Sequence, residues 1–440
     1  MSDRTDSGPL TFGQLYIWRN AEPYPAEMLG EVNLTASVAV PAGVGLPAVT
    51  EAIAVLERRH DVLRTRYDVH ERTGLPYQIV QARTGGAPAV VDGDRANIGR
   101  FVAEAGTWSQ SSPLDPTAGP PWRVTVTVVD GRPTHVVLVA HHVMLDWISL
   151  ERLRAELAGL LAGRPPAGST ARPLDIARDQ GSPRWAQRRA EADRYWDALL
   201  PTLPWREPPP EWAGTPPERS RWHQPVLRSA AFAGALRRLT RRLDVGGASA
   251  MEALTAVTLW RQFGWRQPVL SVMAANRWYS KDMHRALCCT AQPVPAVVPV
   301  DPDETVGDLI RRVHRAGVRA GRTGAYDLDR THILRGRRFR RSDVLFHRQF
   351  IANYVASPQV GSAAPPEPVL SWLPGREAGP NGLLVHDEGT TASLWLRLDE
   401  RLLPRSRAVR LLHAFDAVAG GLDVDDRIGD VAQHDAWSGV

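Results

Sequence analysis

The chain has 440 residues, of which 43% are hydrophobic and 23% are charged, and its formal net charge is +5. That length accommodates two lobes of ordinary domain size, each with its own core, and argues against a single small binding module. The composition is typical of a folded globular protein and excludes a mainly disordered chain. The modest positive charge favours acidic partners only weakly.

No stretch of the sequence is typical of a signal peptide or a membrane span. The first residues contain no apolar run, and the most apolar stretch, Val124 to Leu145, is interrupted by Asp130, Gly131, Arg132 and Pro133. We therefore expect a soluble cytoplasmic protein with no membrane partner.

The sequence lacks the signatures of several other chemistries. It contains no Gly-x-Ser-x-Gly elbow, no Walker A loop, no His-Glu-x-x-His helix and no Gly-x-Gly-x-x-Gly after a strand. The only cysteines, Cys288 and Cys289, are adjacent, which suits neither a disulfide framework nor a zinc site. We interpret both as small buried hydrophobes and expect no metal and no resident cofactor.

The first part of the chain predicts alternating helices and strands. Thr11 and Gln14 form a capping box at the start of an amphipathic helix, because the Thr11 hydroxyl can accept from one amide while Gln14 reaches back. The next elements follow from β-branched alternation or helical spacing: a strand at Val32–Val40, a helix at Pro47–Arg59, an extended segment at Val62–Tyr67, a strand at Tyr77–Val80 and a helix at Ile98–Ser109.

A hairpin leads directly into two histidines. The β-prone runs Trp122–Val129 and His135–Ala140 flank Asp130-Gly-Arg-Pro, a turn sequence. His141 and His142 follow, and leucines at helical spacing predict a helix over Ile148–Leu161. The histidines are therefore expected where a central strand ends and a helix begins.

A stretch rich in Pro, Gly, Ser and Thr, Gly163–Pro173, marks the expected boundary between two lobes, residues 1–168 and 169–440. A charged helix at Trp185–Leu200 and a second Pro-rich stretch at Pro201–Pro217 follow. The remaining pattern is again mixed: strands at Pro225–Ala231, Pro268–Ala274, Val294–Val300, Gln349–Val355, Gly382–His386 and Ala392–Leu398, and helices at Ala233–Arg242, Ala248–Phe263, Thr305–Ala320 and Ser406–Ala419. The fold class predicted is α/β of the α+β type.

The histidine pair with Asp146 four residues later is suited to base or transition-state chemistry, since strand alternation points only one imidazole into a given cleft. If Ala140 and His142 share a face, His141 packs behind it. The alternative is structural: a lone His-His pair is more often part of a core or surface, and Asp146 can simply cap the following helix.

The sequence His141-His142-Val-Met-Leu-Asp146-Trp147-Ile-Ser149 resembles the His-His-x-x-x-Asp-Gly-x-Ser motif of condensation domains from nonribosomal peptide synthetases, a branch of the chloramphenicol-acetyltransferase-like superfamily. Other segments resemble further family motifs in the same order. They are Thr11-x-x-Gln14-x-x-x-Trp18, Arg59-His60-Asp-Val-Leu63-Arg64-Thr65-x-Tyr67, Tyr195-Trp196, Ala275-Asn276-Arg277, Cys288 to Pro293 and Phe350-x-x-Asn353. The resemblance covers roughly Leu10 to Leu422 and identifies the chain as similar to a free-standing condensation protein.

The resemblance implies two lobes of similar fold in a V, with a tunnel between them for pantetheine arms. His142 would be the catalytic residue, either a general base on the acceptor or a group that orients it and stabilises the tetrahedral intermediate. His141 and Asp146 would be structural, with Asp146 paired to an arginine. Two arginines match the family pattern for that pairing, Arg277 and Arg64, and the choice stays open.

The resemblance also implies a set of tunnel residues, Trp147, Ser149, Gln292 and Asn353. Trp147 stands where the family has glycine, which permits close backbone approach and dihedral angles that other residues avoid. Either the tunnel is reshaped for an unusual substrate or catalysis is lost. The segment Cys288 to Gln292 also departs from the family pattern.

The predicted reaction is transfer of an acyl or aminoacyl group from a carrier-protein phosphopantetheine thioester to an amine or hydroxyl, in natural-product biosynthesis. The expected partners are carrier proteins acting in trans, and the family resemblance implies a monomer. Two alternatives stay open: a non-catalytic module that recruits a carrier or tailoring enzyme, and an acyltransferase that uses coenzyme A.

A basic segment, Arg335 to Arg341, has two interpretations. It can grip a phosphopantetheine phosphate, an acidic carrier helix or RNA, but such a run is more often a solvated loop. Single-stranded nucleic acid would require more interleaved aromatic residues, so no nucleic-acid partner is expected.

Overall fold

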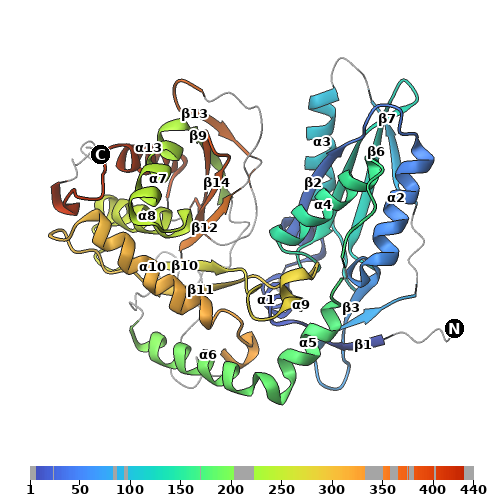
Figure 1. The fold of residues 1–440 in the computed structure, drawn as a ribbon, viewed down its shortest axis with the longest axis horizontal. Helices are drawn as coiled ribbons and strands as arrows, with labels where there is room; N and C mark the ends of the chain where they lie inside the picture. Colours follow the sequence, from blue (N-terminus) through green and yellow to red (C-terminus); the bar gives the residue numbers. More distant parts are fainter. Residues whose placement is uncertain are drawn as a thin grey trace. The chain divides into compact units, whose positions relative to one another are not determined.

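The computed structural model describes residues 6–22, 24–82, 87–93, 98–168, 170–202, 222–331, 350–356, 365–373, 375, 381–400 and 403–430. Two compact units are shown in Figure 1. Unit 1 comprises Met1–Ala190, Ala275–Gln292 and Ala325–Asp329, and unit 2 comprises Glu191–Ala274, Pro293–Gly324 and Arg330–Val440. Each unit is made of three chain segments. The predicted boundary between two lobes, at residues 168 and 169, stays a prediction.

Unit 1 contains two antiparallel-rich sheets with covering helices. A four-stranded sheet has the order β2-β7-β6-β5, and a three-stranded sheet has the order β1-β4-β3. The strands are β1 (Asp6–Pro9), β2 (Asn33–Ala39), β3 (Thr65–Val69), β4 (Pro76–Val80), β5 (Ala89–Asp92), β6 (Trp122–Val129) and β7 (Arg132–His141). The helices are α1 (Phe12–Ala21), α2 (Leu46–Arg59), α3 (Ile98–Ser111), α4 (Trp147–Leu161), α5 (Pro173–Gly181) and α9 (Lys281–Arg285), with 3₁₀ turns at Ala26–Val32, Asp61–Arg64 and Pro183–Trp185.

The expected hairpin is present as β6 and β7. Asp130 and Gly131 both adopt positive φ, at 52° and 72°, which matches the twist that a two-residue hairpin turn requires. Alternation along β7 then divides its side chains between two apolar clusters. Val136, Leu138 and Ala140 belong to one cluster; Val137 and Val139 belong to the other. The strand that ends at the histidines is thus covered on both faces.

The start of α1 is built as the sequence predicts. The Thr11 hydroxyl accepts from the Gln14 amide at 3.2 Å, and the Gln14 side chain accepts from the Thr11 amide at 2.9 Å. Both residues are fully buried, so the capping box is an internal feature rather than a surface helix end. It satisfies amides that burial would otherwise leave unpaired.

Unit 2 is built on an eight-stranded mixed sheet of order β11-β10-β12-β14-β15-β9-β13, with β8 paired to β15. Its strands are β8 (Trp222–His223), β9 (Pro225–Ser229), β10 (Val269–Ala274), β11 (Gln292–Val297), β12 (Phe350–Ala356), β13 (Val369–Trp372), β14 (Gly382–Asp387) and β15 (Ala392–Asp399). Its helices are α6 (Ala186–Leu199), which begins in unit 1, α7 (Ala230–Leu243), α8 (Gly247–Phe263), α10 (Val306–Arg322) and α13 (Arg405–Gly420), with 3₁₀ turns at Leu200–Thr202 and Ile428–Asp430.

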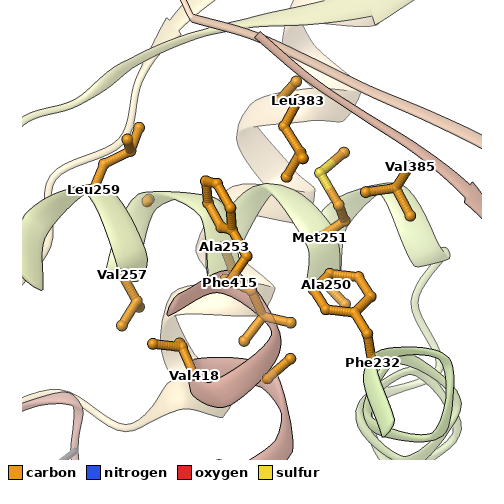
Figure 2. Close-up of a cluster of buried hydrophobic side chains, with 14 of the residues drawn as sticks. Phe232, Ala250, Met251, Ala253, Val257, Leu259, Leu383, Val385, Phe415 and Val418 are labelled. Atoms are coloured by element: carbon orange, nitrogen blue, oxygen red, sulfur yellow. The ribbon is translucent and has the colours of Figure 1, made fainter. Parts of the chain in front are cut away.

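The central helix of unit 2 is α8, which is buried from Ser249 to Leu259. Figure 2 shows its side chains packed with Phe232 of α7, Leu383 of β14 and Phe415 of α13. A helix that is apolar on nearly every side requires partners on every side, and here other helices and the sheet supply them. Gly246 is the N-cap residue, so the helix begins one residue before the predicted start at Ala248.

Some elements differ from those predicted from the sequence. Val62–Tyr67 was expected to be extended, but Asp61–Arg64 forms a 3₁₀ turn before β3 begins at Thr65. The Leu63 amide donates to the His60 carbonyl, a local bond that β-branched composition does not predict. Strand β1 was missed because its partners are distant in the sequence: it pairs with β4, and Arg172 and Arg178 form ion pairs with Asp6. The basic segment Arg335–Arg341 lies outside the described residues.

No helix in the described ranges is both long and apolar enough to cross a membrane.

Glu252 is an acidic residue in the otherwise apolar centre of α8. It is 3% exposed, and its carboxyl lies opposite Gly317 of α10, which has no side chain to displace it. Burial raises the pKa of Glu252 to about 8. The carboxyl group therefore stays protonated in the folded protein at pH values where it is ionised in the unfolded chain.

We predict that the free energy of unfolding of the Glu252→Gln variant increases relative to that of the wild type as pH rises. The folded pKa lies above the unfolded value, so the wild type loses stability between about pH 4.5 and pH 8, by up to about 5 kcal/mol. Urea unfolding from pH 5 to pH 9 measures this: the variant should gain on the wild type with rising pH. Glu104→Gln, at a glutamate whose side chain is 59% exposed, should show no such trend. A constant difference between Glu252→Gln and wild type would contradict the prediction.

Candidate active site

His141 is the last residue of β7, and His142 opens the histidine loop, residues 142–146, which leads to α4. Backbone hydrogen bonds fix both residues. The amide of His141 donates to Pro121 O at 2.9 Å and that of His142 donates to Val32 O at 3.0 Å. The Met144 amide donates back to His141 O at 2.9 Å and closes a turn. The two imidazoles therefore start from a defined backbone rather than from a mobile loop.

His141 is buried, with 1% of its surface exposed. Its Nδ1 accepts the Val143 amide at 3.1 Å, so the ring holds the turn. Burial, together with the neighbouring His142, lowers the pKa of His141 to about 3. The ring is therefore neutral at physiological pH, and it is suited to positioning rather than to proton transfer.

His142 is half-buried. The hydrogen-bond partner of its Nδ1 shows which ring nitrogen carries the proton. Its Nδ1 lies 2.8 Å from Leu145 O. Because a carbonyl oxygen can only accept, Nδ1 carries the proton and donates it. The neutral ring then has its lone pair on Nε2, which is the arrangement required of a general base.

Asp146 is fully engaged by hydrogen-bond donors. It caps α4, since Oδ1 accepts the Ser149 amide at 2.8 Å, and Oδ2 accepts the amide and the hydroxyl of Thr290, each at 3.1 Å. Arg277 Nη2 donates to Oδ1 at 2.6 Å. Burial alone would raise the pKa of Asp146, but the Arg277 charge and the two amides outweigh it and lower the pKa. A carboxylate held this way is structural rather than a proton donor.

Arg277 joins the histidine loop to the segment that follows β10. Besides Asp146, its guanidinium donates to Ser149 Oγ at 2.6 Å and to the carbonyls of Ala286 and Cys288 at 2.8 and 3.2 Å. The open choice between two arginines is thereby decided in favour of Arg277. Arg64, the other candidate, donates to Asp61 at 2.5 Å and to the carbonyl of Gln81, away from Asp146.

Asn276 turns the backbone immediately before Arg277. Its φ is 58°, in the left-handed region that Gly and Asn tolerate best, and its Nδ2 donates to Thr290 O at 2.8 Å. The residue before Arg277 thus turns the backbone so that the guanidinium reaches Asp146.

Two of the residues expected to line a tunnel, Ser149 and Gln292, are buried and bonded to neighbouring segments. Ser149 is fully buried, with its hydroxyl bound to Arg277 and to both backbone groups of Cys288. Gln292 is also fully buried, and both ends of its amide bond the backbone of Tyr326. Both side chains therefore hold neighbouring backbone segments, and their predicted place along a tunnel stays a prediction.

The other two tunnel candidates keep partial exposure. Asn353 lies half-buried on β12 in unit 2. Trp147 is half-buried at the first position of α4, and its backbone is not among those with positive φ. The site of the family glycine therefore imposes no special dihedral angle here. The tunnel itself stays a prediction.

In the described part of the chain, no cluster of three or more His, Cys, Asp or Glu side chains could hold a metal ion.

The family model named condensation domain matches residues 8–364 of this chain. The chain belongs to the condensation domain family. The motif resemblance is thereby confirmed at the level of the family.

Curated relatives of this condensation domain are much longer proteins. It is 27% identical over 340 residues to phosphinothricin tripeptide synthetase PhsC of Streptomyces viridochromogenes, covering 71% of this chain and 29% of that protein. It is 28% identical over 317 residues to the beauvericin nonribosomal cyclodepsipeptide synthetase of Beauveria bassiana, covering 68% of this chain and 9% of that protein. The chain thus spans less than a third of the length of these two relatives.

Solved condensation domains share the fold. The condensation domain of the monacolin K polyketide synthase MokA matches with a TM-score of 0.75 at 19% identity, over 94% of this chain and 97% of that one. The first condensation domain of the calcium-dependent antibiotic synthetase, in complex with a substrate analogue, matches with a TM-score of 0.74 at 15% identity, over 97% and 99%. The predicted mixed α/β fold class is therefore confirmed.

Thr290 and Leu145 contribute to the site, although neither was predicted as a site residue. Thr290 binds Asp146 through two donors, and Leu145 acts only through its carbonyl. A carbonyl leaves no trace in residue type, so Leu145 could not have been found. Thr290 lies in the segment Cys288 to Gln292, which departs from the family pattern, so no motif singled it out.

We predict that Asp146→Asn destabilises the fold strongly. The change keeps the shape but leaves Arg277 buried without its counter-charge, which typically costs about 3–5 kcal/mol. Chemical denaturation at pH 7 measures it. Glu51→Gln removes one member of the exposed pair with Arg58, whose side chains are 65% and 62% exposed, and should cost less than about 1 kcal/mol. Equal losses in the two variants would refute a special role for the buried pair.

Proposed function

We propose that this condensation domain transfers an acyl or aminoacyl group from a carrier-protein phosphopantetheine thioester to an amine or hydroxyl acceptor, with His142 as the catalytic residue. The observation that carries the proposal is the hydrogen bond from His142 Nδ1 to Leu145 O at 2.8 Å, which leaves the lone pair on Nε2. Family membership supplies the reaction class.

In the proposed reaction one proton is transferred, one bond to the carbonyl carbon forms, and one carbon–sulfur bond breaks. His142 Nε2 takes the proton of the acceptor amine or hydroxyl as its nitrogen or oxygen attacks the thioester carbonyl. The tetrahedral intermediate then breaks its carbon–sulfur bond, and the imidazolium returns the proton to the departing pantetheine thiolate. The products are an amide or ester and a free pantetheine thiol, and His142 is regenerated neutral.

The surroundings of His142 support that role. His141 is neutral and buried, so it adds no positive charge that would oppose protonation of its neighbour during turnover. Asp146 is engaged by Arg277, Ser149 and Thr290, so it competes with His142 neither as base nor as acid. Of the three motif residues, His142 is therefore the one suited to move the proton, and backbone hydrogen bonds fix its position.

The proposed partners follow from the family and from the names of the relatives. The two relatives described above are named as a tripeptide synthetase and a cyclodepsipeptide synthetase, and a depsipeptide contains both amide and ester bonds. Both acceptor types therefore belong to the proposal. The donor is proposed to be a thioester on a carrier protein rather than free coenzyme A, and a cytoplasmic location is proposed with it.

One observation favours a second candidate function, a non-catalytic module that recruits a carrier or tailoring enzyme. Trp147 places an indole where the family has glycine, on the first turn of α4 next to Ile148, which is 37% exposed. Added bulk beside the histidine loop can block a substrate while leaving the rest of the fold able to bind partners. Removal of the His142 imidazole distinguishes the two functions, because only catalysis requires it.

We predict that His142→Ala abolishes condensation and keeps carrier binding. Candidate acyl-loaded carrier proteins are incubated with an acceptor and the wild type or variant, and intact-mass spectrometry follows the carrier and the product. Unloading by the wild type, with a loss of at least about 100-fold in the variant, supports catalysis. His70→Ala, at an exposed turn, should retain wild-type turnover.

The remaining outcomes decide between the alternatives. If a carrier binds the wild type but is never unloaded, catalysis is abandoned in favour of recruitment. Turnover with acyl-coenzyme A in the absence of any carrier would assign the coenzyme-A-dependent reaction instead.

A further inference from the structure

Cys289 lies directly behind the imidazole of His142. Its Sγ is 3.9 Å from His142 Nδ1, the nitrogen that donates to Leu145 O. The cysteine is fully buried, and its amide donates to Met144 O at 3.0 Å, inside the histidine loop. Both its side chain and its backbone therefore touch the loop that carries the catalytic residue.

The opposite side of Cys289 is held by the start of α1. The Thr11 hydroxyl, which accepts from the Gln14 amide, donates its own proton to Cys289 O at 2.9 Å. Gly13 lies so close that a Cβ there would be 2.5 Å from the same oxygen and 2.8 Å from the backbone of Thr290. The capping box thus packs directly on this peptide, and glycine is the residue that permits the approach.

We propose that Cys289 is a positioning residue for His142, whose sulfur, with Leu145 O, holds the imidazole in the Nδ1–H form and in its ring orientation. The proposal rests on the proposed function of His142. Sulfur is a large, weak hydrogen-bond acceptor and a weak donor, so it fills the space beside Nδ1–H without offering a strong proton to that nitrogen. A hydroxyl at the same place would donate more strongly and favour the tautomer with the proton on Nε2.

The surroundings argue against a nucleophilic role for this cysteine. Burial raises the pKa of the Cys289 thiol well above its ordinary value, so the thiolate that a nucleophile requires is disfavoured. A thiol that keeps its proton leaves the imidazole as the proton acceptor of the pair.

Cys288 provides a matched control one residue away. It is equally buried, and burial raises the pKa of its thiol to about 12. Its Sγ lies near Thr11 Oγ1 at 3.8 Å and Cys289 O at 3.5 Å, on the side of α1 rather than at the imidazole. Loss of either sulfur removes the same volume from the same segment, but only one sulfur contacts His142.

The first test reads the tautomer and needs no substrate. Long-range proton–nitrogen correlation spectra of histidine-labelled full-length protein report which ring nitrogen of His142 carries the proton, with His142→Ala providing the assignment. We expect Nδ1–H in the wild type and in Cys288→Ala. In Cys289→Ala the Nε2–H form should become detectable, and in Cys289→Ser it should increase further. Identical spectra for wild type and both Cys289 variants would overturn the proposal, as would Nε2–H in the wild type.

The second test reads turnover in the carrier assay. Cys289→Ala should lower kcat by about tenfold while KM for the loaded carrier changes less than about twofold, because ring placement acts on the chemical step. Cys288→Ala should lower kcat less than about twofold. Equal losses in the two variants would reduce the effect to core packing and overturn the proposal.

The two tests also separate this proposal from the proposed function. If no carrier is unloaded by any variant, the function fails while the spectra still decide the role of Cys289. If His142 is required for turnover but its tautomer does not depend on Cys289, only the positioning role fails.

Discussion

The candidate site depends on one buried ion pair, between Asp146 and Arg277. Neither charge could remain buried alone, because an ionised group loses several kcal/mol of hydration when it leaves water. The surroundings compensate each charge with specific donors and acceptors: Asp146 accepts from four donors, and Arg277 donates to carbonyls and to Ser149. The pair therefore joins two segments more than 120 residues apart in the sequence, and the histidine loop is held as a result.

The local elements of the fold could be predicted from the sequence where one physical signal dominates. Thr11 and Gln14 form the capping box, Asp130 and Gly131 form the hairpin turn, and α8 is buried as its apolar composition indicates. Each of these depends on residues close together in the chain. The prediction was wrong where a backbone bond decides the conformation, as in the 3₁₀ turn at Asp61–Arg64.

The candidate site could be predicted only in part, for a related reason. The motif selected His142, His141 and Asp146 because imidazole and carboxylate groups are visible in the sequence. Cys289 was interpreted only as a buried hydrophobe, and its contact with His142 depends on a separation of 147 residues. Ser149 was selected for a role in a tunnel, and the structure shows in addition that its hydroxyl joins Arg277 to the backbone of Cys288. Residue type alone does not distinguish these uses.

The replacement of glycine by Trp147 also has a clearer meaning in the structure. The position is the first residue of α4 with ordinary backbone dihedral angles, so the backbone does not require glycine. What changes is side-chain volume on the first turn of a helix whose cap, Asp146, is fixed. The difference from the family pattern therefore concerns the space available near the histidine loop rather than the path of the chain.

The composition of unit 1 limits how members of this family can be recombined. Its three segments come from residues 1–190, 275–292 and 325–329, and the partner of Asp146 belongs to the second of them. A chimera joined once, between the histidine motif and residue 275, would take Asp146 from one parent and Arg277, Cys289 and Thr290 from the other. Such a chimera would combine, in one hydrogen-bonded network, residues from two different parent proteins. Crossovers that move residues 275–292 together with the N-terminal segment keep that network from one parent.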